Sequence, residues 1–273
     1  MRQTAQASAK HVLGRPRLHL RRTDSTNDRA RELASAGAPH GMLVTASEQT
    51  AGRGRQGRRW SAPPGSALLM SLLVRSPPPL LPLIAAVAVC DVAGEDAAIK
   101  WPNDIVVLRP AGAARAGGGA GVAPGAVGSG SLAKLAGILV EGRPQERWAV
   151  LGIGVNVAVE LEELPAELRP GGERGAGAPL AAATLGLTRD AIEPTLSQLL
   201  TALGHRLGEP PEATLDAWRA RDALCGREIA WSGGRGRAHG VDGTGRLVVV
   251  LPEGGQTTLS AGEVHLRDLS GGH

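Results

Sequence analysis

Hydrophobic and polar residues follow two different patterns along this chain, and the change between them falls near residue 226. Before that point, short apolar runs typical of β-strands are interspersed with longer runs typical of helices. Beyond it, short strand-like runs are separated by glycine-rich turns. The expected strands of the first part are 17–22, 42–47, 67–74, 99–108, 134–142 and 147–157, and the expected helices are 29–36, 80–95, 190–207 and 211–224. The pattern therefore predicts a large part of helices and strands followed by a small all-strand part.

The second part has the pattern of a small barrel. Its five short runs are "REIAW", "GRAHGV", "RLVVVL", "QTTLS" and "EVHLR". Five short strands with glycine-rich turns are typical of a small closed sheet. In the first part, Pro102 interrupts the run 99–108, which predicts an edge strand or a bulge there.

Two segments carry too few large side chains to bury much surface. Residues 111–131 are mostly glycine and alanine, and residues 169–179 are rich in glycine, proline and arginine. Such segments gain little from burial to offset the entropy of ordering. Both are expected to be flexible surface loops.

Length and composition limit the class of protein. A chain of 273 residues is expected to form one large domain and a small one. Its longest apolar stretch, 80–90, is far shorter than the roughly 20 residues that a membrane span needs. The N-terminus has no apolar signal-peptide region. Two scattered cysteines, Cys90 and Cys225, fit a reducing compartment. We therefore expect a cytoplasmic protein with no membrane segment.

The positive charge is concentrated in one stretch. The formal net charge is +4, and much of the excess lies in "TAGRGRQGRRW", residues 50–60. A local excess predicts one anion-binding site rather than an extended nucleic-acid surface. A nucleic-acid-binding protein that uses this Arg/Gly run remains the alternative of another class. It would be expected to carry stacking aromatic residues, but the chain has neither Phe nor Tyr.

Four motifs follow one another in the first part. They are "DSTN" (24–27), "EQTAGRGRQGRRW" (48–60), "KWPND" (100–104) with "KLAGILVE" (134–141), and "GIGVNV" (152–157). All three asparagines and two of the three lysines of the chain lie inside them. As an ordered set, the motifs resemble those of the biotin protein ligases, or biotin–[carboxylase] ligases. The C-terminal part looks like the small SH3-like barrel of that family, so the resemblance spans about residues 18–269.

The resemblance implies an α+β fold, with a mixed-sheet catalytic domain of the biotin/lipoate ligase type and a small SH3-like β-barrel after it. It divides the chain into an N-terminal extension (1–17), a catalytic domain (18–224) with a Gly/Ala-rich insertion (111–131), and the barrel (225–269). Some members carry a helix-turn-helix domain before the first strand. About 17 residues are too few for one, so we expect the monofunctional form and no specific DNA binding.

The resemblance also implies the reaction. The family adenylates biotin with ATP to give biotinyl-5′-AMP and pyrophosphate. It then transfers biotin to a lysine of a biotin carboxyl carrier domain of a carboxylase. ATP and biotin would be the substrates, with Mg²⁺ accompanying ATP. A lipoate or octanoate attachment enzyme of the same fold is the alternative, ranked lower because "GRGRQG" and "KWPND" are biotin-side motifs.

The arginine-rich loop suits such chemistry. A carboxylate that attacks a triphosphate brings two anions together, so the site needs cations and N–H donors. Gly52, Gly54 and Gly57 allow backbone amides to approach an anion. Arg53 and Arg55 can neutralise carboxylate and phosphate oxygens in bidentate fashion. By resemblance, Gln49 joins these two arginines in contacting biotin or the adenylate.

The motif "DSTN" has two possible roles. Taken alone, it is an ordinary helix cap. By resemblance, Ser25, Thr26 and Asn27 recognise the ureido ring of biotin, which needs both donors and acceptors.

The lysine motifs supply the expected chemical end of the site. By resemblance, Lys134, with Gly137 beyond it, reaches the carboxyl and α-phosphate oxygens and stabilises the charge that develops there. Lys100, Asn103 and Asp104 would border the nucleotide. Asp104 could position Mg²⁺ or help to deprotonate the acceptor lysine, and the sequence does not choose between these.

The remaining asparagines also have two interpretations. Asn156 matches a ribose- or phosphate-side contact but would also suit a turn, and Asn103 would suit an Asx turn. Trp60 and Trp101 are expected to be pocket wall and core rather than stacking platforms. The expected catalytic residues are Lys134, Arg55 and Asp104; the expected biotin contacts are Ser25, Thr26, Asn27, Gln49, Gly52, Arg53, Gly54, Arg55, Lys134 and Gly137; the expected nucleotide contacts are Arg53, Arg55, Lys100, Asn103, Asp104 and Asn156.

Overall fold

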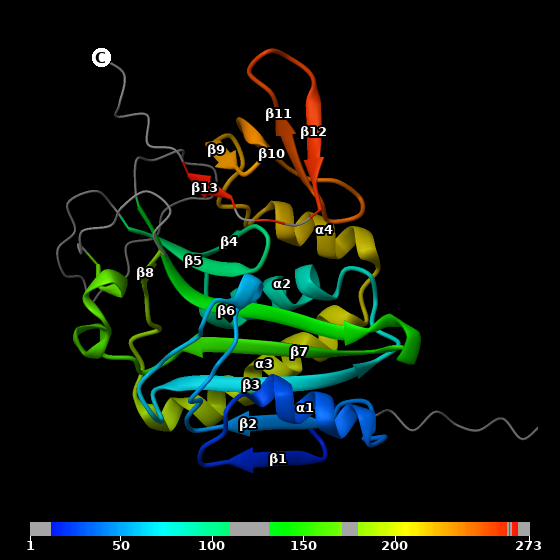
Figure 1. Ribbon diagram of the computed structural model, residues 1–273, viewed down its shortest axis with the longest axis vertical. Coiled ribbons are helices and arrows are strands. Elements are labelled where there is room, and N and C mark those ends of the chain that lie inside the picture. The colour runs from blue at the N-terminus through cyan, green and yellow to red at the C-terminus, as the bar shows by residue number, and fades with distance from the viewer. Residues whose placement is uncertain (1–11, 110–130, 171–179, 261, 263, 267–273) are drawn as a thin grey trace, which may run out of the picture.

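The computed structural model describes residues 12–109, 131–170, 180–260, 262 and 264–266. Two β-sheets organise the chain (Figure 1). The larger sheet has eight strands and lies in the main body of the molecule, and the smaller sheet has five and lies at one end of it. In the described part of the chain, no helix is both long and apolar enough to cross a membrane.

The larger sheet is mixed, as expected. Its strands lie in the order β1-β2-β3-β7-β6-β5-β4, and β8 pairs with β6. The pairs β1–β2 and β6–β8 are parallel, whereas the other pairs are antiparallel. Their bounds are β1 (Arg17–Leu20), β2 (Leu43–Ala46), β3 (Ala67–Arg75), β4 (Ala97–Lys100), β5 (Asp104–Arg109), β6 (Ser131–Arg143), β7 (Trp148–Asn156) and β8 (Ala181–Ala182).

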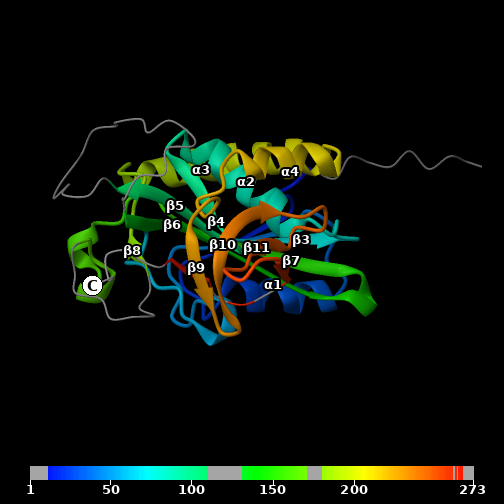
Figure 2. The ribbon, with the colours of Figure 1, turned by 90° about the horizontal axis from the view of Figure 1, so that it is seen from above.

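Helices cover the two faces of this sheet unequally (Figure 2). One face carries α2 (Leu81–Ala93), α3 (Ile192–Leu207) and α4 (Pro211–Arg219). The main hydrophobic core lies on this side, and α2 is apolar on nearly all sides because the sheet, α3 and α4 all pack against it. Pro82 in its first turn and Gly94 after its last residue define its ends.

Among the α-helices of the described residues, only α1 (Thr26–Ser35) lies on the other face, and it packs on β2, β3 and β7 through a small cluster that includes Ala30, Val44 and Val150. The strip of sheet beside α1 is therefore covered by loop residues rather than by a second helix. Trp60, from the arginine-rich loop, packs there against Ala67 and other members of a third cluster.

The smaller sheet is antiparallel throughout, with the order β12-β11-β10-β9-β13. Its strands are β9 (Glu228–Trp231), β10 (Gly234–Val241), β11 (Leu247–Val250), β12 (Gln256–Leu259) and β13 (His265–Leu266). The five expected strands are thus confirmed. No pairing joins β12 to β13 among the described residues, so closure into an SH3-like barrel stays a prediction.

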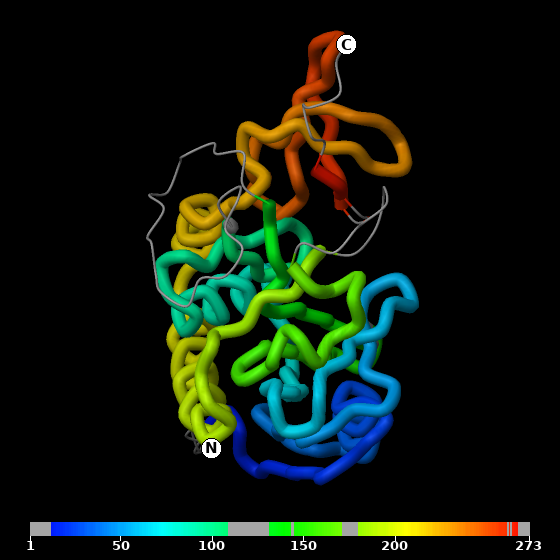
Figure 3. The backbone as a smooth tube through the Cα atoms, turned by 90° about the vertical axis from the view of Figure 1, so that its left-hand side faces the viewer, coloured from blue at the N-terminus to red at the C-terminus, as the bar shows by residue number. Residues whose placement is uncertain are grey.

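The two sheets share one core. Ile229, Ala238 and Val249 of the smaller sheet belong to the same buried cluster as α2 and the larger sheet. Trp101 Nε1 donates a hydrogen bond of 3.2 Å to the carbonyl of Gly245. Figure 3 shows the smaller sheet standing at the end of the body, beside the turn after α4.

Four expectations about the elements and domains need correction or stay untested. The run 99–108 is not one strand with a bulge: β4 and β5 form an antiparallel hairpin, and Pro102, which lacks an N–H donor, lies in its turn. The expected edge is correct, since β4 ends the strand order. The helix 211–224 ends earlier, at Arg219. The loops 111–131 and 169–179 lie almost wholly outside the described residues. The domain limits remain predictions.

Candidate active site

Three glycines leave part of the α1 side of the larger sheet without side chains. They are Gly137 on β6 and Gly152 and Gly154 on β7, and we call them the glycine floor. A Cβ atom at Gly152 would lie 2.2 Å from Asn27 Oδ1, and one at Gly154 would lie 2.6 Å from the indole ring of Trp60. At Gly137 the distance to that ring would be 3.1 Å. Only glycine therefore lets Asn27 and Trp60 lie directly on the sheet.

Lys134 reaches the same face through an irregularity in β6. Residues 134 and 137 of a regular strand would point to opposite faces. Here Lys134 and Ala136 pair with consecutive residues of β5, so Leu135 is an extra residue that forms a bulge. As a result, Lys134 Nζ lies 2.6 Å from Asp104 Oδ1 and 5.5 Å from the centroid of the Trp60 ring.

The start of α1 brings a buried polar cluster to the other end of the glycine floor. Ser25 precedes the helix in an extended conformation, but its side chain makes no capping hydrogen bond. Thr26 donates to Gln49 Oε1 through both its backbone N–H, at 2.7 Å, and its hydroxyl, at 3.0 Å. Ser71 Oγ lies 2.8 Å from Thr26 Oγ1 and 2.6 Å from Asn27 Oδ1. These polar groups bond to one another instead of serving as a simple cap.

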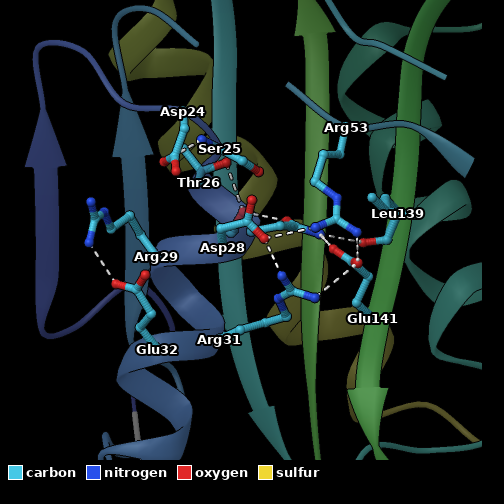
Figure 4. A network of polar contacts seen from close by, with 12 residues as sticks. Asp24, Ser25, Thr26, Asp28, Arg29, Arg31, Glu32, Arg53, Leu139 and Glu141 are labelled. Atoms are coloured by element: carbon cyan, nitrogen blue, oxygen red, sulfur yellow. Dashed lines mark hydrogen bonds and ion pairs between the residues drawn. The ribbon is translucent and has the colours of Figure 1, made fainter. Parts of the chain in front are cut away.

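Arg53 connects the arginine-rich loop to both α1 and β6 (Figure 4). One terminal nitrogen donates to Asp28 Oδ1 at 2.9 Å, and the other donates to Glu141 Oε1 at 2.9 Å. We call Asp28 and Glu141 the carboxylate clamp. Arg31 also pairs with both carboxylates, so two positive and two negative side chains balance. Both terminal nitrogens of Arg53 are thus engaged with protein carboxylates, and a contact with a phosphate would require a change of partner.

The rest of this loop folds back on itself. The N–H of Trp60 bonds to the carbonyl of Gly52, and the N–H of Gly54 bonds back across the loop. A Cβ at Gly52 would lie 2.4 Å from the Trp60 carbonyl oxygen and 2.8 Å from Gln49 Nε2, so close backbone approach explains this glycine. Arg55 begins a single 3₁₀ turn at the loop tip. Trp60 Nε1 is buried and has no hydrogen-bond partner in the described part of the chain.

Two of the expected nucleotide contacts bond to the backbone. Asn103 Nδ2 donates to the Ile138 carbonyl at 2.9 Å, so this side chain bridges the β4–β5 hairpin to β6 instead of forming an Asx turn. Asn156 Nδ2 donates to the Ala183 carbonyl at 2.8 Å, which ties β7 to the segment after β8. Lys100 lies almost buried at the end of β4, next to the same hairpin turn.

Sequence reasoning missed several residues that the structure places here. Glu141 and the glycines at 152 and 154 lie inside the quoted motifs, yet none was selected as a site residue. Asp28 follows "DSTN" directly. Ser71 offered a signal, because it is the one polar residue in the apolar run "ALLMSLLV". A fully buried hydroxyl in a central strand requires a partner.

Metal binding by protein side chains alone finds no support in the described ranges. No three residues of the types His, Cys, Asp and Glu come together there in a group that could hold a metal ion.

Comparisons with known proteins agree on a single family. The model of the biotin/lipoate A/B protein ligase family matches residues 19–157, about half of the chain. The biotin–[acetyl-CoA-carboxylase] ligase of Mycobacterium tuberculosis is 33% identical over 270 residues, which cover 90% of this chain and 87% of that protein. The bifunctional ligase/repressor BirA of Bacillus spizizenii is 36% identical over 170 residues, and these span only 45% of that protein. The chain thus spans about half the length of this relative.

A solved structure shares the fold. The biotin protein ligase from Aquifex aeolicus, in complex with biotin and ATP, matches with a TM-score of 0.65 and 22% identity, over 92% of this chain and 98% of that one. The family match at residues 19–157 contains the glycine floor, the carboxylate clamp and the Lys134–Asp104 pair. On these grounds, the chain belongs to the biotin/lipoate A/B protein ligase family.

Proposed function

We propose that this protein is an ATP-dependent ligase that forms biotinyl-5′-AMP and transfers biotin to a lysine of a biotin carboxyl carrier domain. One observation carries the proposal: the glycine floor has a buried hydroxyl and amide cluster at one end and a lysine–carboxylate pair at the other. Such a surface suits a flat ligand with a ureido ring at one end and a carboxyl group at the other. The family and its named biotin ligases support this choice.

The ureido end would be recognised by Ser25, Thr26 and Asn27, with Gln49 holding Thr26 in place. Glycine at 137, 152 and 154 lets Asn27 and the Trp60 ring lie on the sheet, and the apolar part of the ligand would lie against that ring. Burial of an apolar ring with a few oriented polar groups is the usual design of a small-molecule site.

At the carboxyl end, a biotin carboxylate oxygen attacks the α-phosphorus of ATP, and pyrophosphate leaves. The Lys134 ammonium would stabilise the negative charge that develops on the α-phosphate. Asp104, 2.6 Å away, would hold that ammonium in position. In the second step the acceptor lysine amine attacks the acyl carbon and loses a proton, and AMP leaves. Asp104 is a candidate to accept that proton.

For the nucleotide we propose Arg55, in the 3₁₀ turn of the arginine-rich loop, and Lys100 beside the hairpin turn. Asn103 and Asn156 would act by holding the strands that border the nucleotide, since their amides bond to backbone carbonyls. Mg²⁺ would arrive on the phosphates of ATP. The partner would be a carrier domain of a biotin-dependent carboxylase, and the two unpaired cysteines are in keeping with a cytoplasmic setting.

Exchange of labelled pyrophosphate into ATP tests this proposal. We expect exchange that depends on biotin and does not occur with lipoate or octanoate. Exchange with lipoate or octanoate alone would support the other activity of the family. Absence of exchange with any of these acids, together with salt-dependent retention of RNA, would instead support the nucleic-acid alternative.

A further inference from the structure

Asn27 is held at both ends of its amide. Its Nδ2 donates to Glu141 Oε2 at 2.8 Å, and its Oδ1 lies 2.6 Å from Ser71 Oγ. Asn27 is 4% exposed and Ser71 is fully buried. An amide can present either its donor end or its acceptor end, so its neighbours decide which one faces a ligand.

The neighbours of Asn27 allow only one orientation. The glutamate side chain at 141 only accepts hydrogen bonds, so the NH₂ group must face it. The Thr26 hydroxyl uses its proton on Gln49, which leaves Thr26 Oγ1 and Asn27 Oδ1 as competing acceptors for the single proton of Ser71. The Asn27 oxygen therefore lies over Gly152 with a lone pair to spare.

We propose that Glu141 is a specificity-determining positioning residue, which forces Asn27 to present its carbonyl oxygen to an N–H group of the ureido ring. This inference rests on the proposed function. Glu141 is suited to the role because its other oxygen is held by Arg53 at 2.9 Å. Arg53 is in turn held by Asp28 at 2.9 Å. The carboxylate thus has a fixed position, and it links the ureido end of the site to the arginine-rich loop.

A reciprocal exchange of the two side chains tests the proposal. Asn27→Asp places two carboxylates at a hydrogen-bond distance, and we expect about 100-fold weaker biotin binding. Glu141→Gln leaves only the longer contact of Asn27 Nδ2 with the Leu139 carbonyl, at 3.5 Å, to orient the amide, and it should weaken binding by about two- to tenfold. In the double variant, the new amide at position 141 would donate to the new carboxylate at position 27, whose second oxygen would again be an acceptor over Gly152. The double variant should therefore bind biotin within about tenfold of the wild type.

Binding is measured by titration calorimetry with biotin alone, in the absence of ATP, so that the chemical step plays no part. Glu32→Gln is the matched control, because Glu32 is an exposed carboxylate of α1 that pairs with Arg29. It should bind like the wild type. Asp28→Asn removes the other carboxylate from Arg53 without contacting Asn27, so it should give no rescue when combined with Asn27→Asp.

The double variant decides the question by itself, even where Asn27→Asp does not fold. If Asn27→Asp/Glu141→Gln binds biotin no better than Asn27→Asp, or fails to bind, the inference is overturned. Equal binding by the wild type and both single variants also overturns it. Failure of the wild type to bind biotin would overturn the proposed function as well, and that outcome is distinct from the others.

Discussion

Adding a single methyl group at Gly152 should disable the ureido end of the site. In Gly152→Ala the new Cβ would lie 2.2 Å from Asn27 Oδ1, 2.8 Å from Cγ and 2.9 Å from Nδ2. The amide must therefore move by about 1 Å, because van der Waals contact requires more than about 3 Å. That movement breaks its bonds to Ser71 and Glu141. One neutral and one charge-assisted bond together amount to about 3 kcal/mol.

We expect Gly152→Ala to unfold with a free energy lower by about 3 kcal/mol and to lose biotin affinity by more than about 100-fold. Urea denaturation measures the first quantity and calorimetry the second. Gly204→Ala is the matched control, since its Cβ would meet its nearest atom at 3.9 Å on the helix α3. It should stabilise the fold by about 1 kcal/mol. A Gly152→Ala protein with unchanged stability and biotin affinity would refute the close packing of Asn27 on the floor.

Three further predictions concern other parts of the molecule. Lys134→Ala should slow biotin-dependent pyrophosphate exchange by about 10² to 10³. Lys134→Arg should restore only part of the rate, because a planar guanidinium group cannot replace a compact ammonium group. Full activity of either variant would contradict this prediction. Burial raises the pKa of Asp222 to about 6 from an ordinary 3.8. Between these two values the folded state keeps a proton that the unfolded state has released. The free energy of unfolding should therefore fall as pH rises from about 4 to about 6. Asp222→Asn should remove this pH dependence of the free energy of unfolding and stabilise the protein at neutral pH by up to about 3 kcal/mol. Denaturation at several pH values measures both effects. Parallel pH profiles of the wild type and the variant would argue against the prediction. Trp101→Phe removes the hydrogen bond to the Gly245 carbonyl. It should lower the free energy of unfolding by about 1 kcal/mol and speed hydrogen exchange in the smaller sheet. Unchanged exchange would show that this bond does not help to hold the two sheets together.

The sequence by itself determined most of the elements and the family. Strand β3 and helix α2 could be assigned because burial on all sides requires unbroken apolar runs, and their lengths distinguish a strand from a helix. The expected strands 134–142 and 147–157 are separated by only a few residues, and they pair with each other in the structure as β6 and β7. The resemblance of the motifs to the biotin protein ligases selected Asn27, Gln49 and Lys134, and the rarity of asparagine and lysine in this chain supported two of these choices.

Tertiary structure alone decided how these residues meet. The bulge at Leu135 turns Lys134 toward Asp104, and a period of two in the sequence would have placed Lys134 on the other face. Gly137 becomes part of one floor only because the register pairs it with Gly154. Arg53 and Glu141 are 88 positions apart, and no local pattern relates them. Local periodicity reflects which side chains are buried, but strand order, register and bulges depend on the packing of the whole sheet, and these bring the charged partners together.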